Sequence, residues 1–158
     1  MRTGSDVGIL GSFGLAVYAF ATPHGPNRSA IAAIAVVGLI VASVARILPS
    51  ERIIRSRWRE AFLVLWSSIS IFVVAVIAQL DGGVDSPATI LFVLPVLFAA
   101  LTSPLRVTIV VGIIDVTAFL SVAGASGDNL AYSSFTAFGL LCVAAISAFQ
   151  ARNQARRR

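Results

Sequence analysis

The chain has 158 residues, of which 58% are hydrophobic and only 12% are charged, and its mean hydropathy is +0.93. An ordinary soluble domain carries about 25% charged residues, so the composition excludes that class and predicts an integral membrane protein whose first partner is the lipid bilayer. All twelve basic residues are arginine, and they flank apolar runs as membrane orientation signals do. We therefore expect no nucleic-acid partner.

Six apolar segments approach the about 20 residues that a membrane-spanning helix needs. They are residues 7–22, 29–48, 61–80, 88–102, 105–123 and 130 to about 149. The first is short and needs the residues before Val7 to reach across the bilayer. The predicted fold is all-α, a polytopic bundle of six transmembrane helices.

The first segment carries small residues at every fourth position, namely Gly4, Gly8, Ser12 and Ala16. Such a stripe lets another helix approach closely. It is explained by packing within the same bundle or by a seam between two copies of the chain. Between the second and third segments, residues 50–60 fit either a short helix lying on the membrane surface or a plain charged connector.

The arginines predict the orientation, because positive residues beside membrane spans stay on the cytoplasmic side. All of them except Arg28 fall on one side of the six predicted spans. We expect both termini to be cytoplasmic and residues 22–28, 81–87 and 124–129 to form outer loops, with Tyr18 and Tyr132 near the outer interface. The expected location is the inner (cell) membrane of a bacterium, crossed several times.

The fourth segment has a clear start and an interruption. Ser86 is suited to cap a helix whose first residue is Pro87. Pro95 lies near the middle of the segment and has no amide hydrogen. We expect it to kink the helix and to leave the carbonyl of Leu91 unpaired.

Asp115 lies near the middle of the fifth segment, where an ionised carboxylate is costly. At helical spacing it shares a face with Thr108, Gly112 and Ala118, which suits close helix contact. Hydroxyls that could bond to it are those of Ser67, Ser68 and Ser70. The carboxyl either ties two helices together or senses a ligand or proton.

Candidate catalytic and metal-binding residues are few. His24 is the sole histidine, Cys142 is the sole cysteine, and lysine is absent, so nucleophilic triads, cysteine metal clusters and phosphate-binding lysine loops are not expected. We expect neither an enzyme site nor a metal site in this chain. His24 and the acidic loop residues Asp81, Asp85 and Asp128 are interpreted as solvated turn residues.

From residue 130 to residue 158 no proline occurs and no signal stops the last helix where it leaves the bilayer. We expect that helix to continue through Gln150, Arg152 and Gln154. Residues 1–150 are then the membrane domain, and residues 151–158 are a basic cytoplasmic extension that leads to an output domain. The alternative is a chain that ends in a basic anchor.

The turn between the third and fourth segments reads Gly82-Gly83-Val84-Asp85-Ser86-Pro87-Ala88. With the six-segment layout, it resembles the input domains of bacterial histidine kinases and diguanylate cyclases. It is most similar to redox-responsive histidine kinases with an outer loop Gly-Gly-x-x-Asn-Pro-Phe that is associated with quinone. Gly82, Gly83 and Pro87 match, whereas Ser86 and Ala88 replace asparagine and phenylalanine.

This resemblance implies a sensor module that passes a membrane or outer-side signal through the last helix, that forms a homodimer, and that has quinone as a candidate ligand. The alternatives are a small transporter or channel subunit and a structural membrane protein without a ligand. The candidate ligand-binding or sensing residues are Gly82, Gly83, Asp85, Ser86, Pro87, Pro95 and Asp115.

Overall fold

The computed structural model describes residues 2–25, 27–47, 58–126 and 130–156, and this part of the chain is helical without any strand. Its α-helices and two 3₁₀-helices (η) follow one another as α1 (Arg2–Ala21), α2 (Arg28–Ile47), α4 (Arg59–Leu80), η1 (Gly83–Asp85), η2 (Pro87–Phe92), α5 (Val93–Thr102), α6 (Leu105–Ser126) and α7 (Leu130–Arg156). The prediction of an all-α fold is confirmed.

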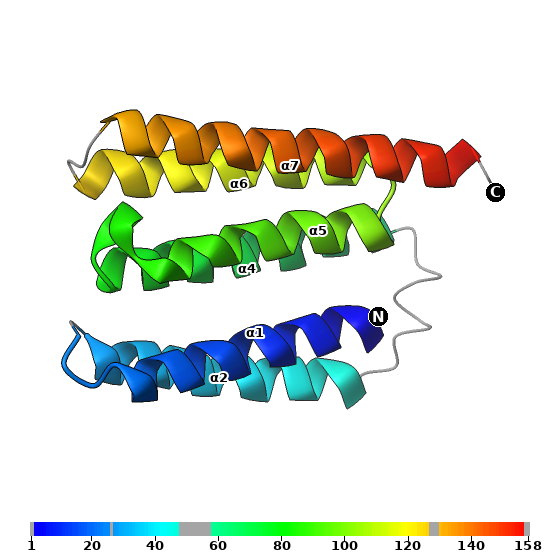
Figure 1. The fold of residues 1–158 in the computed structure, drawn as a ribbon. Coiled ribbons are helices and arrows are strands. Elements are labelled where there is room, and N and C mark those ends of the chain that lie inside the picture. The colour runs from blue at the N-terminus through cyan, green and yellow to red at the C-terminus, as the bar shows by residue number, and fades with distance from the viewer. Residues whose placement is uncertain (1, 26, 48–57, 127–129, 157–158) are drawn as a thin grey trace.

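The helices lie side by side as three stacked pairs, α1 with α2, α4 with α5, and α6 with α7 (Figure 1). The turns after α1 and α4 lie at one end of the bundle, where α6 also ends, and we call this the turn end. Helix α1 begins and α7 ends at the opposite end (Figure 1). The α1–α2 pair contacts the other helices far less than its two members contact each other.

The surface of the bundle is rich in large apolar side chains, and a few polar groups lie within its mostly apolar interior. Many large apolar side chains are exposed, and Phe20, Phe72 and Ile90 are each more than two-thirds exposed. Ser67, Thr108, Asp115 and Ser147 are buried. An apolar exterior is stable only against another apolar medium, which a bilayer supplies.

Among the described residues, three helices are long and apolar enough to cross a membrane, and their apolar windows are Arg28–Ala45, Arg59–Leu80 and Leu105–Ala125. Three shorter apolar helices are Gly8–Ala21, Pro87–Thr102 and Thr136–Gln150. These lengths and the exposed apolar surface are those expected of a membrane protein.

The helices begin and end within a few residues of the predicted bounds, with two extensions. Helix α1 begins at Arg2, so the residues before Val7 do lengthen the short first segment. Helix α6 continues to Ser126, so the prediction that residues 124–129 form a turn is wrong over residues 124–126. No proline interrupts this stretch, and Gly124 stays helical, so the helix runs on. The predicted surface helix at residues 50–60 falls mostly outside the described residues.

Pro95 lies just after a change of helix type and not in the middle of an α-helix. Residues Pro87–Phe92 are a 3₁₀-helix, and the α-helix starts only at Val93. Pro95 therefore lies in the first turn of α5, where an amide hydrogen has no partner within the helix. The carbonyl of Leu91 is not unpaired, because the amide of Val93 donates to it.

The 3₁₀ segment also lengthens this short stretch of chain. Six residues at about 2.0 Å each and ten at about 1.5 Å span about 27 Å, against about 24 Å for sixteen α-helical residues. The hydrocarbon layer of a bilayer is about 30 Å thick. The change of helix type at Val93 therefore brings the length of Pro87–Thr102 closer to the thickness of that layer.

Small residues allow close approach within the pairs. A Cβ atom at Gly8 would lie 3.3 Å from the Cβ of Ala42, and one at Gly38 would lie 2.8 Å from the Oγ of Ser12. The predicted small-residue stripe of the first segment thus packs at Gly8 and Ser12 against α2, within one chain. In the same way, a Cβ at Gly112 would lie 3.0 Å from the Cβ of Ala144, which brings α6 against α7.

Candidate functional site

The turn after α4 is built on two left-handed glycines. Gly82 has φ +115° and Gly83 has φ +80°, angles that side chains with a Cβ rarely adopt. Ser86 then caps η2 as predicted: its Oγ accepts a hydrogen bond from the amide of Ala88 at 3.0 Å, and Pro87 follows as the first helical residue. Gly83 and Ser86 are buried, whereas Asp85 is exposed.

Asp81 is the centre of a polar cluster at the turn end, formed with Tyr18, Arg28 and Ser86, and we call these four residues the turn cluster. Its Oδ1 forms an ion pair with Arg28 Nη1 at 2.6 Å, and its Oδ2 accepts hydrogen bonds from Tyr18 Oη at 2.9 Å and from Ser86 Oγ at 2.5 Å. The guanidinium carbon of Arg28 lies 4.7 Å from the centre of the Tyr18 ring. Charge, hydrogen bonds and a cation–π contact therefore act together.

The turn cluster joins parts of the chain that are distant in sequence. Tyr18 comes from α1, Arg28 starts α2, and Asp81 and Ser86 flank the glycine turn. Asn27, next to Arg28, adds a hydrogen bond from its Nδ2 to the carbonyl of Leu80 at 3.0 Å. The α1–α2 pair is thus fastened to the turn between α4 and η2 by polar contacts at one end of the bundle.

The interpretation of Asp81 as a solvated turn residue is wrong. Its side chain has no exposed surface, and that of Arg28 is only 13% exposed. Sequence reasoning missed Arg28 and Tyr18 as members of a site. One signal was present: Arg28 is the single arginine that breaks the orientation pattern, and a carboxylate in the neighbouring loop is the simplest partner for it.

We expect Gly82→Ala to destabilise the protein although its methyl group meets open space. At φ +115° the methyl costs about 1 to 2 kcal/mol of backbone strain. Gly14→Ala is the matched control, since Gly14 also has no atom within 4 Å of an added Cβ but lies in helix α1. It should stabilise the protein by up to about 1 kcal/mol. The free energy of unfolding in mixed detergent micelles measures both effects. A change in the same direction for the two variants would contradict the expectation.

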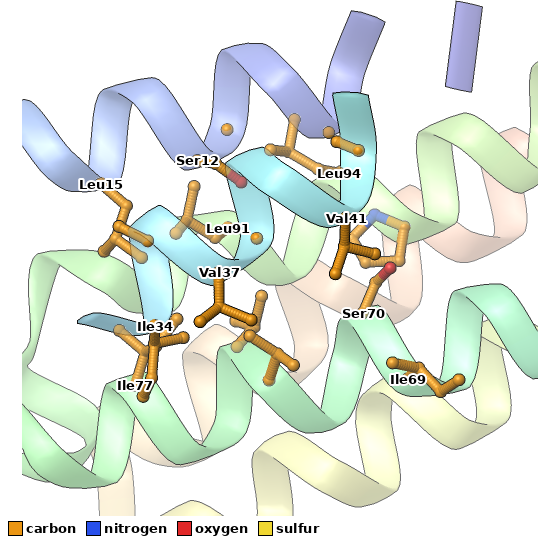
Figure 2. Close-up of a pocket in the computed structure, with 18 of the residues that line it drawn as sticks. Ser12, Leu15, Ile34, Val37, Val41, Ile69, Ser70, Ile77, Leu91 and Leu94 are labelled. Carbon is orange, nitrogen blue, oxygen red and sulfur yellow. The ribbon is translucent and has the colours of Figure 1, made fainter. Parts of the chain in front are cut away.

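An apolar cavity of about 360 Å³ lies between the α1–α2 pair and helices α4 and α5 (Figure 2). This volume is within the range of about 300 to 1,000 Å³ found for small-molecule sites. Pro95 lines the cavity, as do Leu91 and Leu94 from the same stretch of chain. Among the described residues that line it, none is charged, and the hydroxyl groups come from Ser12, Ser67 and Ser70.

Asp115 is fully buried in α6, and neither of its carboxylate oxygens has a hydrogen-bond partner among the described residues. The proposed partners turn elsewhere: the hydroxyl of Ser68 donates to the carbonyl of Val64, and that of Ser70 donates to the carbonyl of Trp66. The prediction that Ser67, Ser68 or Ser70 bonds to Asp115 is therefore wrong. Its neighbour one turn away, Gly112, meets α7 as the small-residue face predicts.

The predicted site residues are thus divided among three places. Gly82, Gly83 and Ser86 belong to the glycine turn, with Asp85 and Pro87 exposed beside it. Pro95 lines the cavity and Asp115 does not. In the described part of the chain, no three histidine, cysteine or acidic side chains gather as a metal site would require. His24 and Asp85 are exposed, and Asp128 lies outside the described residues.

Searches of protein-family models, of curated proteins and of solved structures found no match to this chain.

Proposed function

We propose that this chain is the membrane-embedded input module of a bacterial signal-transduction protein of the histidine kinase or diguanylate cyclase type. In this proposal six helical segments cross the inner membrane and both termini face the cytoplasm. The turns after α1 and α4 then face outward, and α7 relays the signal to a cytoplasmic output domain. The module works as a homodimer, as the resemblance of the glycine turn implies.

The observation that carries the proposal is the continuity of α7. Its apolar part ends at Gln150, but the helix runs on without a break to Arg156. Twenty-seven residues span about 40 Å, which is more than the about 30 Å of the hydrocarbon layer. A continuous helix transmits rotation and translation along its axis, so a change in packing within the membrane would reach the end of α7.

The six-span topology is supported by the lengths of the shorter apolar helices. Helix α1 has 20 residues, about 30 Å, and the η2–α5 stretch reaches about 27 Å. The beginning of α1 and the end of α7 lie at the end of the bundle opposite to the turns (Figure 1). An even number of crossings is the arrangement that agrees with this placement.

The turn cluster suits a sensor because it is a polar connection between two loosely packed parts. It holds the α1–α2 pair to the turn that starts η2, while the cavity separates the same parts deeper in the bundle. A transporter needs polar groups along one path. Pro95 and Asp115 lie in different places, since Asp115 does not line the cavity, and this favours the sensor over the transporter.

The test is a fusion of residues 1–158 to the catalytic domain of a diguanylate cyclase, with alanines inserted after Gln150. Each α-helical residue turns the helix by about 100°, so two inserted residues rotate the output domain by about 200° and seven rotate it by only about 20°. We expect cyclic di-GMP output to change with two insertions and to return with seven. A cyclic di-GMP output that does not depend on the angle of rotation would contradict a relay through α7.

The fusion also tests whether the turn end takes part in signalling. In the fusion without insertions, Asp81→Ala should shift the cyclic di-GMP output, because it releases the α1–α2 pair from the turn. Asp85→Ala is the matched control, since Asp85 is an exposed carboxylate in the same turn. Equal output from both variants and the parent would count against the turn cluster as part of the sensing path.

A further inference from the structure

The cavity between the α1–α2 pair and helices α4 and α5 is elongated. The side chains of α4 that line it run from Trp66 to Ile77, which is about 16 Å of helix. This length and the apolar lining suit an extended hydrocarbon chain that lies along α4.

The mouth of the cavity faces the apolar exterior of the bundle. Val37 and Val41 of α2 and Ile69 of α4 line the cavity, and each is about half exposed. Figure 2 shows these three side chains on the facing turns of α2 and α4. An opening at this depth in two membrane-spanning helices is reached from the hydrocarbon layer and not from water.

The side chains that line the cavity match a hydrocarbon chain without polar groups. Of the three lining serines, Ser70 already donates its hydroxyl to the carbonyl of Trp66 on its own helix. With no charged residue among the described lining side chains, a headgroup would have no partner inside. The polar end of an occupant must therefore remain at the membrane surface, while its chain lies between the helices.

We infer that this cavity is a binding site for one acyl chain of a membrane phospholipid, which enters sideways between α2 and α4. Burying methylene groups among protein side chains gains nothing over lipid through the hydrophobic effect, so the gain comes from filling an otherwise empty space with close contacts. The acyl chain lies between the α1–α2 pair and helices α4 and α5, which make few direct contacts with each other. Binding does not depend on the proposed signalling role.

Trp66 provides a reporter, because it lines the cavity and Trp58 is the only other tryptophan. In a Trp58→Phe background, the purified chain is placed in phosphatidylcholine vesicles whose acyl chains carry bromine, which quenches tryptophan fluorescence on contact. We expect strong quenching of Trp66. Ser70→Phe fills the cavity, and since a ring and an acyl chain cannot share a close-packed space, quenching should fall about twofold or more.

The matched control is Ser121→Phe. Ser121 donates its hydroxyl to a carbonyl one turn back, as Ser70 does, but it is exposed on α6 away from the cavity. Its quenching should equal that of the parent. Gly11→Leu is the second cavity-filling variant: an added Cβ there lies 3.6 Å from Leu94 Cδ1, an ordinary contact, so the backbone accepts the side chain. Circular dichroism and gel filtration confirm that each variant is folded.

Equal quenching in the parent and in folded cavity-filling variants would overturn the inference, because Trp66 would then be meeting only the surrounding lipid. Relief of the quenching by a small mole fraction of an unbrominated isoprenoid alcohol, but not by the same fraction of unbrominated phospholipid, would overturn the choice of an acyl chain. Signalling in the cyclase fusion is not part of this measurement, so either proposal can fail without the other.

Discussion

Asp81→Ala is expected to lower the free energy of unfolding by about 3 kcal/mol, since hydrogen bonds to a charged group contribute about 1.5 to 3 kcal/mol each and Asp81 accepts two. The substitution leaves the buried hydroxyl of Ser86 without its acceptor and Arg28 without its counter-charge. Loss of circular dichroism during detergent-driven unfolding in mixed micelles measures the change.

The control for this result is again Asp85→Ala, which removes an exposed carboxylate from the same turn and should change the unfolding free energy by less than about 0.5 kcal/mol. A double-mutant cycle with Arg28→Ala tests the pairing itself. Once Asp81 is alanine, removing Arg28 should cost less than it does in the parent, because the partner is already gone. Additive losses would show that the two side chains act independently.

Gly112→Val is the second change with a large expected effect, a loss of about 2 to 3 kcal/mol. Even a single added Cβ would lie 3.0 Å from the Cβ of Ala144, so two further methyl groups must push α6 and α7 apart. Asp115, one turn away on α6, would then lose the tight packing around it. The same unfolding measurement in mixed micelles gives the size of the effect.

Two variants separate close packing from the intrinsic helix preference of valine, which is no worse than that of glycine. Gly139→Val places the same side chain on α7 where nothing lies within 4 Å of an added Cβ, and its cost should be less than about 1 kcal/mol. Ala144→Gly combined with Gly112→Val removes the methyl group with which the valine would clash. The double variant should recover part of the lost unfolding free energy. A Gly139→Val loss as large as that of Gly112→Val would contradict close packing as the cause.

The helices could be predicted because they follow from local signals. Apolar runs of near membrane length predict most of the helices, and the pair Ser86-Pro87 predicts the start of η2. The small residues Gly8 and Gly112 also indicated close contacts, because a helix without side chains at these positions admits a neighbour. Such features depend on residues within a few turns of one another.

The turn cluster and the cavity could not be predicted in this way. Arg28 and Asp81 are 53 positions apart, and their contact depends on how α1 and α2 dock against α4. The cavity exists because that docking is incomplete away from the turn end. The sequence of a single helix does not show how completely it docks against another. The hydroxyls of Ser68 and Ser70 are candidate partners of Asp115 in the sequence, whereas in the structure they donate to backbone carbonyls one turn back on their own helix.

The 3₁₀ winding of η2 also determines which side of α5 faces inward. A 3₁₀ residue turns the chain by about 120° and an α residue by about 100°, so over six residues the two windings differ by about 120°. Helical-wheel positions counted from Ser86 with an α period would place a different face of α5 inward. The burial of Val96 and Ala99, and the hydrogen bond from Thr108 to the carbonyl of Ala99, therefore depend on how tightly the six residues before them are wound.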